Sequence, residues 1–160
     1  MVKRVSFGKA SCPVARALDV IGDWWSLLII RDAFNGARRF GEFQSGLGIA
    51  KGMLSTRLRN LTESGVLQMA PASDGSAYKE YALTEKGRGL FLVIVALRQW
   101  GEDHLYENDE PRSLLVEADT GAQVARLELQ GPTGRSLTWS ETRVEDRPSK
   151  EGHSGIFTAR

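Results

Sequence analysis

The sequence predicts an α+β fold in which helices surround a small antiparallel hairpin, and three observations lead to this class. Apolar residues recur at helical spacing in four segments before residue 65, each followed by glycine. Two runs typical of strands, VLQMA and YKEYAL, then flank a polar turn, and a further apolar helix follows. Beyond residue 111, alternating residues and glycine-rich turns predict a C-terminal antiparallel β meander.

The first two helices are recognised by the residues at their ends. The first is expected over 13–21, because Ser11 can cap it and Pro13 suits its first turn. Asp23 can cap the second helix, which is expected to end at Asn35-Gly36. Its middle, WWSLLII, is almost wholly apolar, so we expect this helix to be buried on several sides.

The next two helices follow each other closely in the sequence. The third is expected over 40–45 and the fourth over 50–64. In the fourth, Leu54, Leu58 and Leu61 share one side of the helix, which predicts that this side faces the core. Two helices joined by so few residues predict a helix-turn-helix.

A hairpin is predicted directly after the fourth helix. Its strands are expected at 66–70 and 78–83, with Asp74 in the turn. Thr84 can cap a last helix, which is expected to run to about Leu105. A helix-turn-helix followed by a hairpin makes a winged helix-turn-helix, so the hairpin loop is the expected wing.

The expected domain organisation has three parts. Residues 1–107 form the winged helix-turn-helix, which serves DNA binding and dimerisation. Residues 108–145 form the small β extension. Residues 146–160 are polar and contain proline and glycine, so we expect a flexible tail.

The composition is that of an ordinary globular chain of 160 residues, 41% hydrophobic and 26% charged, with a formal net charge of +1. The single cysteine, Cys12, has no partner for an internal disulfide. The longest apolar run, LFLVIVAL, is much shorter than the ~20 residues that cross a membrane. We therefore expect a cytoplasmic protein without a membrane segment.

Enzymatic chemistry finds little support in the sequence. It contains no glycine-rich phosphate loop, no cluster of metal ligands, no serine elbow and no histidine near Cys12. We accordingly expect no catalytic residue, no metal and no cofactor.

The charges are distributed unevenly along the chain. Residues 1–64 carry 10 Lys or Arg against 5 Asp or Glu, a net charge of +5, whereas residues 105–160 carry 7 against 10, a net charge of −3. A basic N-terminal region favours a polyanionic partner such as DNA.

The predicted fourth helix carries polar and basic residues opposite its leucines. That side has no acid before Glu63, a pattern typical of a helix that enters the major groove. Arg57, on the flank, suits either DNA contact or an ion pair with a neighbouring acid. The wing is weakly basic and is expected to position the protein rather than to select a sequence. The expected DNA-binding residues are Arg39, Lys51, Gly52, Ser55, Thr56, Arg57, Arg59, Ser76 and Lys79.

Residues 11–105 resemble the HxlR family of bacterial transcriptional regulators, which are winged-helix proteins. The resemblance covers about two-thirds of the chain and leaves out the final 55 residues. The positions that carry it are Cys12-Pro13, Ile21-Gly22, Trp25, Arg31, Arg39-Phe40, Glu42, Leu54, Arg57-Leu58, Leu61, Gly65, Tyr81, Leu83-Thr84, Gly87, Leu90 and Trp100.

The resemblance implies a homodimer on an inverted-repeat operator, with Lys51–Arg59 in the recognition helix and repression as the commoner outcome. Two positions depart from the family pattern. Ala50 stands where serine or threonine usually caps the recognition helix, and Trp24 stands where a lysine commonly precedes the family tryptophan.

Cys12 is the candidate redox sensor. It lies at a helix N-terminus with Arg16 one turn further on, so an enlarged thiolate fraction is expected. Some family members use the matching cysteine to sense oxidants or electrophiles. Buried, inert packing is the competing interpretation, and a disulfide between the two Cys12 residues of a dimer is also open.

The last predicted helix supplies the expected dimer interface, because two copies would bury LFLVIVAL more completely than one. The C-terminal meander can instead clamp the dimer, shape a small-molecule pocket or cover apolar surface. The expected interface residues are Leu90, Ile94, Leu97 and Trp100.

The sequence therefore predicts a sequence-specific DNA-binding transcriptional regulator, expected to be a homodimeric repressor. Whether it responds to a small molecule or an oxidant is left open. The alternative is a winged-helix module that binds another protein, which the near-zero net charge favours.

Overall fold

The computed structural model describes residues 6–107 and 109–146 of the 160-residue chain. The chain divides into two compact units, Met1–Glu110 and Pro111–Arg160. Apart from its first residue, the predicted flexible tail over 146–160 lies outside the described residues. Among the residues described, no helix is long and apolar enough to cross a membrane.

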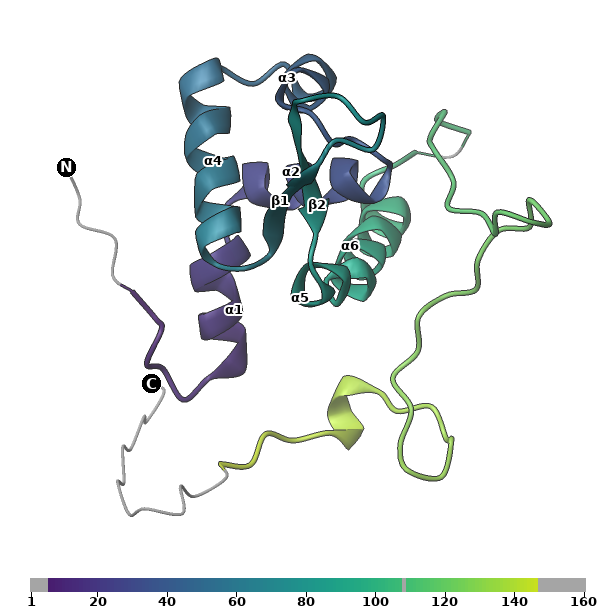
Figure 1. Ribbon diagram of the computed structural model, residues 1–160. Helices are drawn as coiled ribbons and strands as arrows, with labels where there is room; N and C mark the ends of the chain where they lie inside the picture. The colour runs from purple at the N-terminus through teal and green to yellow at the C-terminus, as the bar shows by residue number, and fades with distance from the viewer. Residues whose placement is uncertain (1–5, 108, 147–160) are drawn as a thin grey trace. The chain divides into compact units, whose positions relative to one another are not determined.

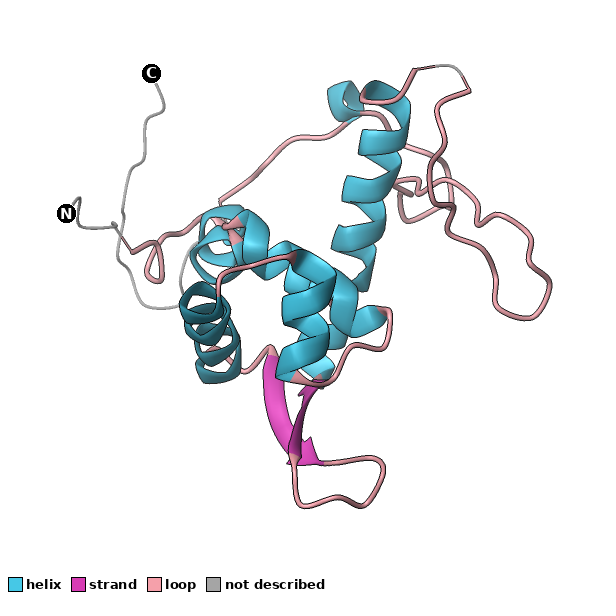
Figure 2. Cartoon of the chain, turned by 90° about the horizontal axis from the view of Figure 1, so that it is seen from above, coloured by secondary structure: helices cyan, strands magenta, loops and turns pink. Residues whose placement is uncertain are grey.

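The first unit contains the predicted helices and hairpin in the predicted order (Figures 1 and 2). The sheet has two antiparallel strands, and the α+β winged helix-turn-helix class is confirmed. The elements are α1 Pro13–Ile21, α2 Trp24–Phe34, α3 Phe40–Leu47, α4 Lys51–Glu63, β1 Leu67–Pro71, β2 Lys79–Leu83, α5 Glu85–Arg88 and α6 Phe91–His104.

The ends of the first two helices follow local chemistry. Pro13 occupies the first turn of α1, but the cap position belongs to Cys12 and makes no side-chain cap bond, so the prediction of Ser11 as the cap is wrong. At α2 the prediction is confirmed, because Asp23 Oδ1 accepts a hydrogen bond from the amide of Ser26 at 3.0 Å.

The core lies between α2, the helix-turn-helix and the hairpin. Helix α2 contacts α3, α4, α6 and β2, as its apolar middle predicts. Its Ile29 and Ile30 are fully buried, as is Phe43 of α3. Each such side chain contributes about 1.5–3 kcal/mol through burial. Because α2 is central, the helix-turn-helix and the wing share one rigid support.

The turn between α3 and α4 depends on Gly48. Its φ of 62° lies in the left-handed region, which glycine adopts without a steric penalty. The Gly48 amide donates to the Gln44 carbonyl at 3.0 Å and closes α3. Helix α4 can then begin at Lys51 and set its leucines against α2 and α3.

The hairpin register pairs Leu67 with Leu83 and Pro71 with Lys79. The wing loop, residues 72–78, joins the two strands and turns at Gly75, where φ is 74°. One further backbone bond, from the Tyr81 amide to the Arg38 carbonyl at 2.8 Å, connects β2 with the segment before α3. The wing is therefore attached to the helix-turn-helix by main-chain as well as side-chain contacts.

The single helix predicted from Thr84 to Leu105 is wrong, because α5 and α6 are separate helices. Thr84 does cap α5, accepting from the Gly87 amide at 3.0 Å. The Leu90 amide then bonds to the Gly87 carbonyl, three residues back, which interrupts the regular helical pattern. The two glycines at 87 and 89 lower the helix propensity where this break occurs.

The predicted C-terminal meander is also wrong in its strands. In the described part of the second unit, the pairing consists of two isolated antiparallel bridges, Val116 with Gln123 and Gln130 with Ser136, and a short 3-10 helix spans Trp139–Glu141. The predicted turns are present, but no side chain described in this unit is buried. Alternating residues extend into paired strands only where one face is packed, and that packing is missing here.

Candidate nucleic-acid interface

The exposed side of α4 is the candidate surface for nucleic acid. Leu54, Leu58 and Leu61 are 0% exposed and hold the helix on the core, so its opposite side faces solvent. Figure 1 shows α4 along one edge of the first unit. We call the exposed residues before Glu63 the outer face: Lys51, Gly52, Met53, Ser55, Arg59 and Asn60.

Gly52 leaves the outer face open at its start. A Cβ added there would meet no atom within 4 Å outside the backbone of its own helix. Packing therefore does not demand glycine, although glycine in a helix costs about 1 kcal/mol relative to alanine. Close approach of another molecule is a reason for glycine that fits this position.

Met53 is a residue that the sequence analysis did not assign. Its side chain is 44% exposed beside Gly52, although the helix buries most of its apolar residues. An apolar side chain at a groove-facing position can contact a thymine methyl group. Its place in the helical projection, about 100° from Leu54, was the available signal.

Two predicted contacts on α4 already have partners within the helix. Arg59 Nε lies 3.9 Å from Glu63 Oε1, an i,i+4 ion pair in which both side chains are about two-thirds exposed. Such a pair is weak, so the guanidinium can exchange it for another anion. The Thr56 hydroxyl donates to the Gly52 carbonyl at 3.0 Å and is half-buried. Arg59 is thus more accessible than Thr56.

Arg57 takes the bracing role that the sequence left open. Its Nε lies 3.1 Å from Asp23 Oδ1, and the angle falls outside hydrogen-bond geometry. The Arg57 side chain is 25% exposed and the Asp23 side chain 19%. The pair fastens α4 to the start of α2, so Arg57 supports the recognition helix from its flank.

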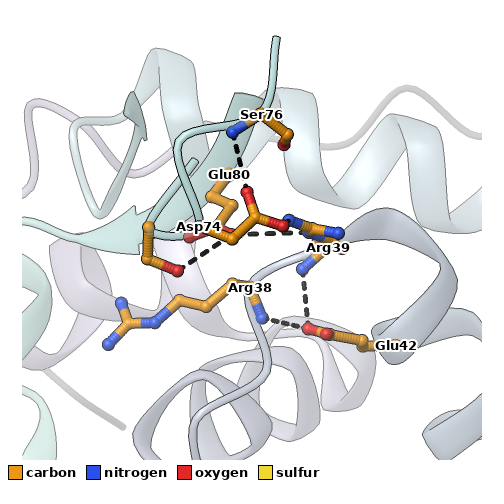
Figure 3. Close-up of polar contacts among 7 residues, drawn as sticks. Arg38, Arg39, Glu42, Asp74, Ser76 and Glu80 are labelled. Atoms are coloured by element: carbon orange, nitrogen blue, oxygen red, sulfur yellow. Dashed lines mark hydrogen bonds and ion pairs between the residues drawn. The ribbon is translucent and has the colours of Figure 1, made fainter. Parts of the chain in front are cut away.

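Arg39 lies among acids of the hairpin (Figure 3). Its Nη2 is 2.6 Å from Asp74 Oδ2, and its Nε is 3.4 Å from Glu80 Oε1. The Glu80 side chain is 8% exposed, whereas those of Arg39 and Asp74 are 39% and 53% exposed. The expected DNA-contacting arginine therefore already balances two carboxylates.

The start of α3 is held by a carboxylate. Glu42 Oε2 accepts from the amides of Arg38 and Arg39 at 2.6 and 2.9 Å (Figure 3). These two hydrogen bonds lower the pKa of Glu42 below its ordinary value. The cap therefore stabilises the fold above the usual glutamate pKa and is lost as pH falls through the lowered one.

Asp74 has a strongly favoured charged form. Its pKa lies well below the usual range because of Ser76, through the hydroxyl and then the amide, and because of Arg39. The Ser76 amide donates to Asp74 Oδ1 at 3.0 Å, whereas the Ser76 hydroxyl is buried without a hydrogen bond, so the amide is the contact supported by geometry. Asp74 is thus ionised when it pairs with Arg39.

The remaining wing residues differ in accessibility. Lys79, at the start of β2, is exposed as predicted, and Ser76 is half-buried. Tyr78, which the sequence analysis did not assign, is 72% exposed in the wing loop. The wing therefore offers one lysine and one aromatic ring to a partner, next to the Arg39 ion pairs.

The expected interface residues on α6 fall into two groups. Leu90 and Ile94 are half-buried and pack against the core. Leu97 and Trp100 are 49% and 57% exposed. Three further apolar residues of α6 that were not predicted are also exposed, Phe91, Leu92 and Val93. The apolar surface of this helix is therefore wider than the sequence indicated.

Cys12 is exposed, which argues against the interpretation that burial keeps it inert. The Nε of Arg16 donates to the Ala10 carbonyl at 2.5 Å, and this contact orients the guanidinium towards a backbone oxygen. The thiol at the N-cap of α1 is therefore open to reagents in solution.

An exposed polar helix face beside a wing, both mounted on one core, is the arrangement of a helix-turn-helix transcriptional regulator. The chain belongs to the HxlR-like helix-turn-helix family, whose sequence model matches residues 20–109. A helix-turn-helix transcriptional regulator of Mycobacterium tuberculosis H37Rv is 48% identical over 98 residues, 61% of this chain. The match spans 62% of the length of that relative.

Solved structures show the same fold. The candidate transcription factor PA1607 is 55% identical, with a TM-score of 0.84 over 89% of this chain and all of that one. The redox regulator HypR in its reduced form is 31% identical, with a TM-score of 0.52 over 59% of this chain and 94% of that one. The PA1607 match thus extends beyond the family model into the second unit.

Proposed function

We propose that this protein is a homodimeric repressor that binds an inverted-repeat operator. The observation that carries the proposal is the outer face of α4, which is exposed, polar and free of acids up to Glu63. Lys51 and Arg59 suit phosphate or guanine contacts, and Ser55 suits shorter hydrogen bonds. Lys79 of the wing reaches the sugar-phosphate backbone beside the groove.

The dimer forms through the exposed apolar side of α6, centred on Leu97 and Trp100. A pair of such helices removes apolar surface from water that one chain leaves exposed. Twofold symmetry then places two α4 helices in successive major grooves, with half-site centres roughly 34–36 Å apart. Bound in this way across a promoter, the dimer blocks access by polymerase.

The two units divide the work. Residues 1–107 bind DNA and dimerise, and the extension from 108 to 145 adds to the dimer. The boundary between the compact units at Glu110 and Pro111 supports this division. The absence of buried side chains in the described part of the second unit supports a role in contacts beyond that unit.

Fluorescence anisotropy tests the proposal directly. Purified protein is titrated into labelled duplex from upstream of its own gene, and into a scrambled duplex, at several salt concentrations. We expect preference for the upstream duplex and a steep loss of affinity with salt, because phosphate contacts release counterions. Weak binding that ignores both sequence and salt would instead favour the protein-interaction module.

Replacing Gly52 by alanine should separate stability from DNA binding. We expect the free energy of unfolding to rise by about 1 kcal/mol, since alanine is the better helix former. Operator affinity should fall, because the added methyl group occupies the space into which DNA approaches. Denaturant unfolding and anisotropy measure the two effects.

The control is Gly101→Ala on α6, where an added Cβ also meets no atom within 4 Å. This variant should be stabilised without a loss of affinity. Unchanged affinity in Gly52→Ala would show that the outer face does not approach DNA at this residue.

We further propose that Cys12 confers a response to oxidants. Its exposure supports this role, as does the likeness to HypR, which is described as a redox regulator. Since the chain has one cysteine, the simplest product joins two copies. Two thiols and one hydrogen peroxide then give one disulfide and two waters.

Peroxide should therefore convert the reduced protein into a species of doubled mass on a non-reducing gel, and operator affinity should change with it. Cys12→Ser should bind like the reduced protein and stay unchanged by peroxide. If the wild type keeps its mass and its affinity after oxidation, Cys12 is not a switch.

A further inference from the structure

Arg39 lies at a junction of three elements. Its amide and that of Arg38 are fixed by Glu42 at the start of α3. The Arg38 carbonyl accepts from the Tyr81 amide of β2 at 2.8 Å. The backbone that carries the Arg39 side chain is thus tied to both the helix-turn-helix and the hairpin.

The Arg39 guanidinium contacts both sides of the wing loop. Asp74 lies within the loop, and its second oxygen accepts from the Ser76 amide, which shapes the turn. Glu80 lies on β2 at the end of the loop, and its Oε1 also accepts from the Ser73 hydroxyl at 3.2 Å. One side chain therefore connects the loop to the start of α3 (Figure 3).

The charge balance argues against a direct DNA contact by Arg39. Its single positive charge faces two carboxylates, and one of them, Glu80, is nearly buried and needs a partner. Moving Arg39 to a phosphate would leave Asp74 and Glu80 unbalanced beside the approaching DNA. Such a move costs favourable contacts and adds repulsion.

We propose that Arg39 is a positioning residue: it holds the wing at a fixed place relative to α4 through Asp74 and Glu80, and it does not itself contact DNA. This inference rests on the proposed DNA-binding function. It also makes Asp74, an acid in a DNA-binding wing, a residue that favours binding.

Asp74→Ala distinguishes the two roles of Arg39, because they predict opposite signs. If Arg39 contacts DNA, removing Asp74 frees its guanidinium and removes a negative charge, so affinity stays the same or rises. If Arg39 positions the wing, affinity falls. We expect a fall of about tenfold, equivalent to about 1.4 kcal/mol, for both Asp74→Ala and Arg39→Ala.

A double-mutant cycle gives a second test. The combined variant Arg39→Ala with Asp74→Ala should lose about as much affinity as either change alone, because both remove the same connection. Arg39→Lys should behave like Arg39→Ala, since one ammonium group does not reproduce a fork that spans two carboxylates. Additive losses in the cycle would overturn the proposal.

A footprint identifies where on the DNA the loss arises. With hydroxyl radicals, Asp74→Ala should lose protection where the wing lies and keep protection around the major groove that holds α4. A general loss of folding would weaken both regions together. Arg38→Ala is the matched control, because Figure 3 shows its guanidinium directed away from Asp74 and Glu80. It should retain the wing footprint.

Arg39→Ala leaves Glu80 nearly buried without its ion pair, so Arg39→Ala with Glu80→Gln provides a variant without that charge. It should fold like the wild type and show the same loss of wing protection. If the wild type binds its operator and Asp74→Ala binds as tightly with an unchanged wing footprint, the inference is wrong. If the wild type itself does not bind DNA, the proposed function fails instead.

Discussion

Replacing Leu97 by glutamate should convert the protein to monomers and reduce its operator affinity by at least about a hundredfold. Leu97 is 49% exposed on α6 within the widest apolar surface of that helix, so a charge there would be buried against a second copy. A monomer binds one half-site and loses the gain of linked binding, which amounts to roughly 10²–10⁴. Light scattering coupled to gel filtration measures the mass, and anisotropy measures the affinity.

Met69→Glu is the control for mass, because Met69 is similarly exposed, at 43%, but lies on β1. That variant should keep the mass of the wild type. If Leu97→Glu remains a dimer with full affinity, α6 is not the interface, and the exposed apolar residues of α1, Val14 and Leu18, become the next surface to test.

Replacing Arg59 by alanine should cost about 1–3 kcal/mol of operator binding if this residue contacts a guanine. The side chain is 66% exposed, and its weak pair with Glu63 does not hold it in place. Loss of a base contact relaxes the preference at one position of each half-site, whereas loss of a phosphate contact weakens binding to all sequences equally. Anisotropy with a set of operators, each substituted at one base pair, separates the two outcomes.

The matched control for this prediction is Arg143→Ala in the second unit. Arg143 is also an exposed arginine paired with a nearby acid, Glu145, and its loss changes the net charge by the same amount. It should leave the base preference unchanged. An Arg59→Ala variant that binds every operator like the wild type would remove this residue from the interface.

The elements of the first unit could be predicted because their signals are local. Asp23 caps α2 from three residues away, and the leucines of α4 recur within a few turns. The outer face of α4 follows from the same periodicity, since fixing the buried side fixes the exposed one. For this reason Lys51 and Arg59 are accessible where the sequence placed them.

The contacts that sequence reasoning missed are distant in the chain. Arg39 meets Asp74 and Glu80, which are 35 and 41 residues away, and no local pattern indicates that pairing. The predicted meander failed for a related reason, because alternation of residues does not state whether another surface will cover one face. Both errors concern what tertiary packing supplies.

Selection from a random pool tests the central claim most directly, since it requires no knowledge of the operator. Full-length protein is incubated with random duplexes, and the bound fraction is amplified and sequenced over several rounds. The account predicts enrichment of an inverted repeat whose half-sites are centred about one helical turn, roughly 10 base pairs, apart. Sequences that stay as diverse as the starting pool would contradict sequence-specific binding by this protein.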